Sequence, residues 1–257
     1  MKVIALLAFY DEQPSMLAAT VASLAKIADH VVASDGGYFL FPGARAHSGI
    51  ESHDAITQTA YACGIGCTIH APQTIWMDNE VGKRNHLVQL GMTIAEPGVD
   101  WFLRIDADEL VSDVPYDFRE RLAATECDAA GVTLWWRSNL VGTGASDEVV
   151  REFDEPGQDQ MRFLLRAVPG LRVEGAHNFY LAERDGQTIV LYGRRDMHDE
   201  VPLADFHDVR LEHRHNHRIR ARNQRAEEFN QRRDTLGIER VWQPMVEHVD
   251  GGMVVKS

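Results

Sequence analysis

Cysteine is scarce in this chain. Cys63, Cys67 and Cys127 are the only three among 257 residues, and their number and spacing fit neither a disulfide framework nor a zinc site. We therefore expect reduced, partly buried thiols in a cytoplasmic protein.

Long apolar runs are also missing. The first eight residues are apolar enough to suggest a signal peptide, but Asp11 and Glu12 follow at once and no cleavage-site pattern does. We interpret this segment as a first buried strand. No apolar run is long enough to cross a bilayer, so we expect no membrane span.

Positive charge is in deficit. The chain has 26 Lys and Arg against 39 Asp and Glu, a formal net charge of −13. This balance argues against general nucleic-acid binding, although a local basic patch can still bind phosphate. Internal repeats and low-complexity tracts are absent as well.

The first third of the chain has the pattern of an α/β protein. An apolar run over 3–9 predicts a strand covered on both faces. Residues 14–28 predict an amphipathic helix, and 30–34 predict a second strand that ends in Asp35-Gly36-Gly37. A strand, a helix and a strand in this order favour a parallel pair with a right-handed crossover.

Further elements follow along the chain. We expect a loop over 38–52, a short helix over 53–62, a strand over 67–70, a helix that begins within 76–85, and a strand that runs into Asp106. Beyond it we expect strands at 131–136, 161–166 and 188–192, a mobile acidic loop over 142–157, an Arg-dense helix over 216–235, and little pattern after Pro244.

Two carboxylates end the strand that begins at Trp101. Strand side chains alternate, so Asp106 and Asp108 emerge on the same side. Ligands of open α/β sheets bind beyond the carboxyl ends of the strands, and two acids there can seat a divalent cation that takes substrate phosphates as further ligands. The alternative is a strand-end turn that caps a following helix.

The ordered set of motifs resembles the GT-A glycosyltransferases, in particular the family 2 type. The set is an apolar strand, Tyr-Asp-Glu, an amphipathic helix, a strand ending Asp-Gly-Gly, a Lys-Arg-Asn helix and Ile-Asp-Ala-Asp-Glu. The resemblance covers residues 1–110 well and continues loosely through 162–181 and 212–214. Where the family usually has Asp-Asp-Gly-Ser, this chain has Ser34-Asp35-Gly36-Gly37. Asp35 matches the family motif, and the residues on either side of the Asp-Gly pair differ from it.

The resemblance implies a Rossmann-like, mostly parallel mixed sheet flanked by helices, with a C-terminal acceptor-side extension and helix. It implies one domain over 1–257, in which 1–110 bind a nucleotide-sugar and 111–240 form the acceptor side. The nucleotide-sugar would contact Phe9, Tyr10, Glu12, Asp35, Lys83, Arg84, Asp106, Ala107 and Arg218. Mn²⁺ or Mg²⁺ would be held by Asp106, Asp108 and His213.

Several of these residues have simpler interpretations. An acid such as Glu12 sits well at a helix start, Asp35-Gly36-Gly37 alone is a tight turn, and Lys83 with Arg84 alone is a solvated helix face. Alternate histidines around His213 suggest zinc, but no cysteine or second histidine group supports that.

The general base that would deprotonate an acceptor hydroxyl is assigned only to the stretch over 173–178, and its residue is left open. Glu174 or His177 is the candidate, and the alternative for His177 is a hydrogen-bonded histidine at a strand end. Asp147, Glu148, Asp154 and Glu155 of the acidic loop are rival bases on a plausible lid.

The expected function is transfer of a sugar from a nucleotide-diphosphate sugar, with UDP favoured, to an acceptor hydroxyl. The acceptor is open: a protein, a glycan, a lipid or a modified nucleotide. The alternatives are a nucleotidyltransferase, which would need a glycine-rich basic loop after the first strand, and a non-catalytic nucleotide-sugar-binding module. An aspartyl phosphatase is disfavoured because its Asp-x-Asp normally ends the first strand.

Overall fold

The structure is a computed structural model. It describes residues 1–77, 79–141, 148–152, 160–174, 180–184, 186–192, 202–214, 225, 228–229, 231–232, 235, 245–249 and 252–256.

The N-terminal elements alternate between strand and helix up to the Asp-x-Asp stretch. They are β1 (Val3–Ala8), α1 (Pro14–Leu24), β2 (His30–Ser34), α2 (Ile50–Ala62), β3 (Gly66–His70), α3 (Asn79–Met92) and β4 (Trp101–Asp106). All the elements expected here are present, and α2 begins at Ile50 rather than at residue 53.

The second half is mostly strand. Its elements are β5 (Glu109–Asp113), α4 (Phe118–Ala124), β6 (Ala129–Val141), β7 (Glu148–Glu152), β8 (Gln160–Arg166), β9 (Arg172–Val173), β10 (Tyr180–Arg184), β11 (Gln187–Tyr192), β12 (Leu203–His213), β13 (Met245–Val249) and β14 (Gly252–Lys256). The three strands expected in this half are confirmed as β6, β8 and β11.

One mixed sheet joins the two halves. Its order is β3-β2-β1-β4-β8-β6-β12-β5, with β7 beside β6. The strands from β3 to β4 are parallel, and β8 then runs antiparallel to β4 and to β6. The protein is therefore α/β, with a parallel N-terminal part and a mixed remainder.

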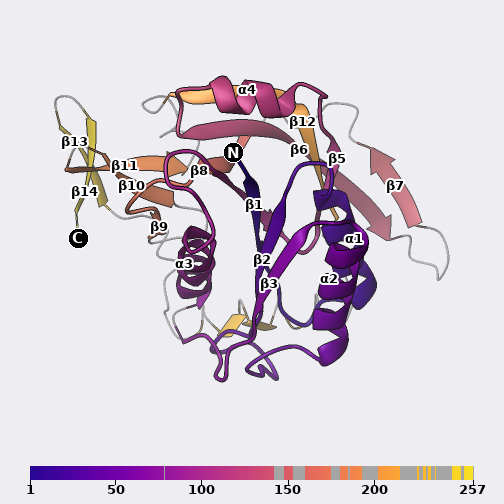
Figure 1. The fold of residues 1–257 in the computed structure, drawn as a ribbon. Helices are drawn as coiled ribbons and strands as arrows, with labels where there is room; N and C mark the ends of the chain where they lie inside the picture. Colours follow the sequence, from indigo (N-terminus) through magenta and orange to yellow (C-terminus); the bar gives the residue numbers. More distant parts are fainter. Residues whose placement is uncertain are drawn as a thin grey trace.

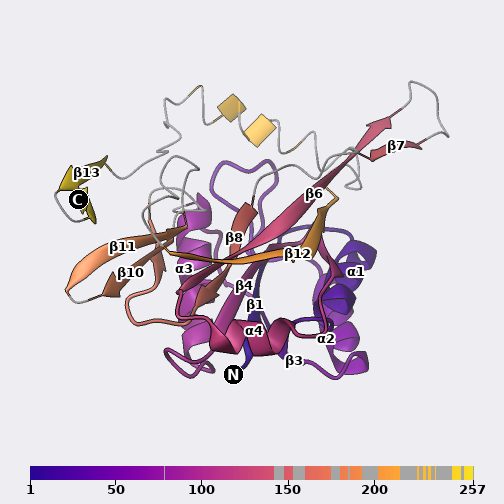
Figure 2. The ribbon, with the colours of Figure 1, turned by 90° about the horizontal axis from the view of Figure 1, so that it is seen from above.

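Helices cover both faces of the parallel part, with α1 and α2 on one side and α3 on the other (Figures 1 and 2). The alternation of side chains along β1 explains why both faces of the sheet are covered. Val3, Ala5 and Leu7 lie in the hydrophobic core that includes α1 and α2, whereas Ile4 and Leu6 lie in the core that includes α3. A strand with two apolar faces needs a cover on each of them.

Three expectations for the second half are wrong or fall outside the described residues. The acidic loop contains a strand, because Glu148–Glu152 pairs with β6. The tail after Pro244 contains the β13–β14 hairpin. Most of the expected helix over 216–235 lies outside the described residues, but residues 225, 228–229, 231–232 and 235 are helical.

The long strand β12 was not expected at all. Its buried residues Phe206, Val209 and Leu211 do not keep a period of two. The register shift between Phe206 and Arg210 is the reason, because an irregularity in pairing turns the following residues over.

Two smaller observations complete the fold. The three cysteines are free, and Cys63 is exposed rather than partly buried. Among the residues described, we find no helix with the length and hydrophobicity required to cross a membrane.

Candidate nucleotide and metal site

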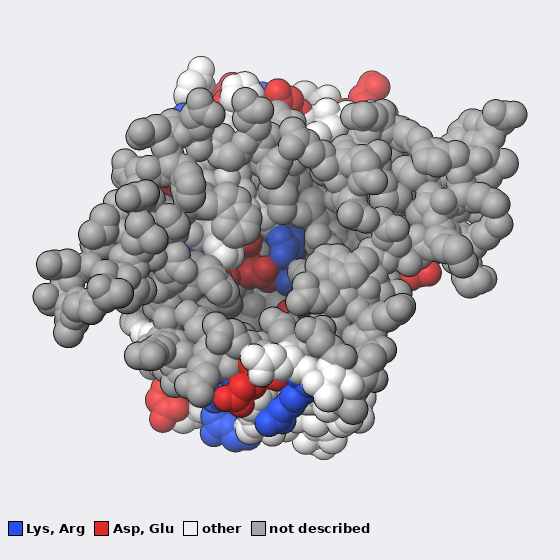
Figure 3. Space-filling model, turned by 180° about the vertical axis from the view of Figure 1, so that it is seen from behind, with Lys and Arg blue, Asp and Glu red and all other residues white. Residues whose placement is uncertain are grey.

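The parallel strands end level with one another. Ala8 of β1 pairs with Ser34 of β2 and with Asp106 of β4, and Ser34 pairs with His70 of β3. The segments that follow these strands therefore begin at one edge of the sheet. Seen from behind, the molecule has a hollow whose floor exposes acidic and basic side chains next to each other (Figure 3).

Asp106 is bound by two arginines. Arg84 of α3 donates to its Oδ1 at 2.6 Å and Arg104 of β4 donates to its Oδ2 at 2.7 Å. The Arg104 guanidinium also lies 5.0 Å from the centre of the Phe163 ring. Both arginine side chains are buried, while Asp106 is 24% exposed. The charge of Asp106 is thus balanced before any ligand arrives.

Asp108 is buried and faces a histidine from a distant strand. His213 at the end of β12 pairs with Glu109 of β5, and this register brings its Nε2 to 3.5 Å from Asp108 Oδ2. The backbone N–H of Arg214 donates to the carbonyl oxygen of Asp108 at 2.6 Å. The fold therefore brings together Asp108 and His213, the two residues that the resemblance implies would share a cation.

Glu109 stabilises the turn that contains Asp106 and Asp108. Its Oε2 accepts a hydrogen bond from the Asp106 N–H at 2.8 Å. Burial raises the pKa of the Glu109 carboxyl to about 8, and the nearby carboxylate of Asp106 adds to the rise while Arg104 opposes it. A strand follows this turn, so the alternative role of the acids as a helix cap does not apply.

The donor set fits a divalent cation in part. An aspartate oxygen and an imidazole nitrogen that approach each other, Asp108 and His213, are a plausible pair of cation ligands. Asp106 fits less well as a direct ligand, because both of its oxygens already accept from guanidinium groups. Asp106 is better placed to anchor the arginines.

Lys83 and Arg84 do not form a solvated helix face. Lys83 is fully buried and donates to the carbonyl oxygens of Phe9 and Gly36, so it joins the segments after β1 and β2. Burial lowers the pKa of Lys83 to about 7, against the opposing effect of Asp35. For Arg84, burial opposes the charged form, but Asp106 raises its pKa above the usual value.

Asp35 is an internal anchor. It is fully buried. Its carboxylate accepts from the N–H of Gly36 at 2.6 Å, from the N–H and hydroxyl of Ser48 at 2.7 and 2.8 Å, and from His53 Nε2 at 2.7 Å. A direct contact between Asp35 and a nucleobase, as the resemblance implies, would require one of these donors to be displaced.

The residues expected to contact the nucleoside after β1 are largely buried. The Phe9 ring meets the His53 ring edge-on at 6.0 Å, and the Tyr10 hydroxyl accepts from the Arg45 N–H at 2.7 Å. Glu12 is also buried, and the N-cap position of α1 is taken by Gln13, whose side chain makes no capping hydrogen bond. The Ala107 side chain lies in the core.

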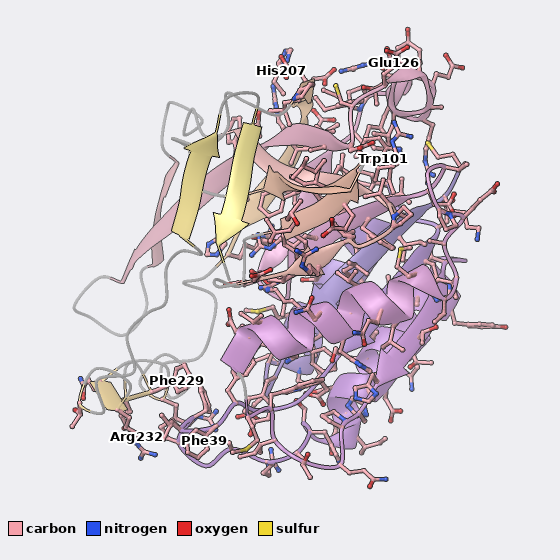
Figure 4. All side chains as sticks on the ribbon, turned by 90° about the vertical axis from the view of Figure 1, so that its left-hand side faces the viewer. Phe39, Trp101, Glu126, His207, Phe229 and Arg232 are labelled. Atoms are coloured by element: carbon pink, nitrogen blue, oxygen red, sulfur yellow. The ribbon has the colours of Figure 1, made fainter. Side chains whose placement is uncertain are left out.

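The residue before Glu12 pairs with two arginines. Asp11 forms ion pairs with Arg45 at 3.4 Å and with Arg225 at 2.5 Å. The Arg225 pair ties the segment around residues 225–235 to the turn that follows β1. Figure 4 shows Phe229 and Arg232 of that segment close to Phe39, and the Phe229 ring lies 5.7 Å from that of Phe41.

The candidate general bases are only partly described. Glu174 follows β9 and forms an ion pair with Arg172 at 3.2 Å. Asn85 of α3 exchanges two hydrogen bonds of 2.7 Å with Val173, so this strand end lies against the helix that carries Arg84. His177 and Arg218 lie outside the described residues, as do Asp147, Asp154 and Glu155.

Two residues of the site were not identified from the sequence. Arg104 lies two positions before Asp106, and strand alternation could have revealed that both share a face. Tyr180 of β10 is buried, and burial raises the pKa of its hydroxyl while the hydrogen-bonded Arg84 opposes the rise. No local sequence pattern identifies Tyr180, because its place in the site depends on its contact with Arg84 of α3.

Comparison with known proteins adds no assignment. No family model matches the chain, and no curated protein matches it.

Proposed function

We propose that the chain is a metal-dependent glycosyltransferase of the GT-A type. It would transfer a sugar from a nucleotide-diphosphate sugar, with UDP favoured, to an acceptor hydroxyl. The observation that carries the proposal is the meeting of Asp108 and His213 beside Arg84 and Asp106, where β4 ends. An α/β sheet binds its ligands at this edge.

The arginine beside the acids supports binding of a diphosphate. Arg84 is buried, and its Nε and Nη1 have no hydrogen-bond partner among the described residues. Buried donors without partners are costly, and an anionic oxygen would satisfy them. When a sugar–phosphate bond breaks, negative charge grows on the diphosphate, and fixed donors at that place stabilise the transition state.

The cation would be held by Asp108 and His213. When bound, Mn²⁺ or Mg²⁺ would supply Lewis-acid neutralisation of the departing diphosphate. Asp106 holds Arg84 and Arg104 in place, so that the N–H groups of both arginines are already oriented before the nucleotide-sugar binds. Lys83 fixes the two carbonyl groups that follow β1 and β2, and thereby shapes the nucleoside end of the site.

The acceptor side would be supplied by the second half of the chain. Glu174 and His177 are the proposed candidates for the base that takes the proton from the acceptor hydroxyl. The hydrogen bonds between Asn85 and Val173 support this placement, because they hold the strand before Glu174 against α3.

Calorimetry and donor hydrolysis test the proposal. The purified chain is titrated with UDP-, GDP- and dTDP-sugars in the presence of Mn²⁺, and nucleotide release is followed with and without metal. Binding of one donor is expected, with metal-dependent hydrolysis that is lost in Asp108→Asn and in His213→Ala. Asp113→Asn is the matched control, because it removes an exposed carboxylate from the far end of β5.

The possible outcomes separate the alternatives. Absence of binding by all three donors, with and without metal, refutes the proposal. Binding without any turnover supports a non-catalytic nucleotide-sugar-binding module instead. Release of pyrophosphate from a nucleoside triphosphate and a sugar phosphate supports a nucleotidyltransferase.

A further inference from the structure

We propose that His47 and His53 form a second metal site, for a borderline transition metal such as Zn²⁺, at the start of α2. Asp35, His47 and His53 each offer one ligand atom, and within the described part of the chain these atoms lie within 4.8 Å of one another. The group is separate from Asp108 and His213, and it does not depend on the glycosyltransferase proposal.

The partner of His53 fixes which ring nitrogen carries the proton. Its Nε2 lies 2.7 Å from Asp35 Oδ2. A carboxylate oxygen can only accept, so Nε2 donates, and in the neutral imidazole Nδ1 keeps its lone pair. A histidine that donates one ring N–H to a carboxylate and offers the other nitrogen is the common arrangement of a metal-bound imidazole.

His47 has the complementary arrangement. Its Nδ1 lies 2.8 Å from the carbonyl oxygen of Ser48. A carbonyl also only accepts, so Nδ1 donates, and in the neutral imidazole Nε2 keeps its lone pair. Backbone carbonyls orient metal-bound histidines in the same way as carboxylates do. Both imidazoles therefore present a nitrogen lone pair while their other nitrogen is held.

The spacing of the two rings suits a shared ion. Their centroids are 5.9 Å apart, with planes inclined by 44°. Zinc binds imidazole nitrogen at about 2.0–2.1 Å, and two imidazoles on one tetrahedral zinc then have centroids about 5–6 Å apart. His47 is exposed and the His53 side chain is 15% exposed, so an ion and its waters can reach the site.

Asp35 makes the site rigid. The two donors from Ser48 and the donor from Gly36 hold its carboxylate whether or not His53 is present. His53 thus receives an acceptor that is already oriented. Asp35 therefore acts by positioning His53, and the ion is bound by the two imidazoles and by water.

One acidic side chain at the start of α2 favours a cation there. Glu51 in the first turn of α2 folds its carboxylate against Gly49, which offsets the positive end of the helix dipole. An ion on His47 and His53 would tie the segment after β2 to α2. The Phe9 ring lies against His53, so this tie would also order the nucleoside end of the site.

The test uses the full chain in an Asp108→Ala background, which removes the other candidate cation site. Binding of Zn²⁺ is measured by calorimetry, and Co²⁺ is used as a probe because its visible absorption reports nitrogen ligands. One equivalent of each metal is expected to bind. His47→Ala is expected to weaken Zn²⁺ binding by at least about tenfold, since loss of even an orienting partner costs that much.

Two further variants keep the test falsifiable. His53→Ala also removes a partner of Asp35, so its folding is checked by thermal unfolding; His47 is exposed, so His47→Ala is expected to stay folded. His86→Ala is the matched control, because the His70 and His86 rings lie 4.0 Å apart and are another pair of imidazoles. Zn²⁺ affinity that is unchanged in His47→Ala, or lost in His86→Ala alone, overturns the proposal.

Discussion

The buried ammonium group of Lys83 predicts a specific dependence of stability on pH. Lys83 is fully buried, and its pKa is lowered from 10.5 to about 7. Burial is the main cause. The charged groups that face it are Asp35, Glu80 and Asp106, which raise its pKa, and Arg84, which lowers it.

The sign of the effect follows from proton binding. Between the folded and the unfolded pKa, the unfolded chain carries a proton on Lys83 that the folded chain has released. Stability contributed by Lys83 therefore rises with pH across this interval, at about 1.4 kcal/mol per pH unit. From about pH 7.5 to about pH 9.5 the expected gain is about 2–3 kcal/mol, and below about pH 6.5 the contribution is nearly constant.

Replacement by a residue that does not titrate isolates this effect. The free energy of unfolding is measured by urea denaturation for the wild type and for Lys83→Met at several pH values. The difference between them is expected to rise in favour of the wild type as pH increases, because only the wild type has the titrating group. Loss of the hydrogen bonds to Phe9 and Gly36 adds an offset that does not depend on pH.

A second variant checks the reasoning. Lys83→Gln is expected to show the same slope as Lys83→Met with a different offset, because neither side chain titrates. A difference that stays constant within about 0.5 kcal/mol over this range would mean that Lys83 is protonated in the folded protein. In that case its ammonium group would be solvated or paired more strongly than the structure indicates.

Three further substitutions have effects on stability that urea denaturation can measure. Gly91→Ala is expected to destabilise the protein by about 1–3 kcal/mol, since the new Cβ would lie 2.7 Å from Phe102 Cε1. Thr20→Val is expected to cost about 1–3 kcal/mol, because a buried hydroxyl donates to the carbonyl of Ala107 at 2.7 Å; Mn²⁺ binding, followed by calorimetry, should weaken as well. Arg166→Met is expected to cost about 2–4 kcal/mol, since the guanidinium donates to backbone carbonyls and lies over the Trp101 ring.

Gln89→Ala provides the common control for these three variants. Gln89 is exposed on α3, and its replacement is expected to change the free energy of unfolding by less than about 0.5 kcal/mol. If Gly91→Ala changed the free energy of unfolding as little as this control does, α3 would have room to move away from β4. Thr20→Val with unchanged stability would mean that water replaces the lost hydroxyl. A similarly small change in the free energy of unfolding for Arg166→Met would mean that water replaces the guanidinium at the backbone carbonyl groups that it binds.

The parallel part of the sheet could be predicted because its signals are local. The apolar runs in β1, β2 and the first half of β4 indicate strands with two buried faces, and the edge at which they end follows from parallel order. Asp106 was identified by this reasoning. The same reasoning could have added Arg104, since alternate residues of a strand share a face.

The second half could be predicted less well because its signals depend on irregular pairing. The bulge in β12 breaks the alternation that would have marked a strand. As a result, His213 was assigned to the metal site only through the resemblance, whereas the pairing of His213 with Glu109 shows how it reaches Asp108.

The sequence by itself determined the order of strands and helices in the first half and the edge at which the acids gather, because hydrophobic periodicity is a property of neighbouring residues. Only the tertiary structure decided what each charged group contacts. Asp106 is matched by Arg84 and Arg104, while Asp108 meets His213 from β12. Lys83, which a local pattern places on a solvated face, is buried between two carbonyls. Charges act through distances in space, and segments far apart in the chain set those distances only once the sheet has formed.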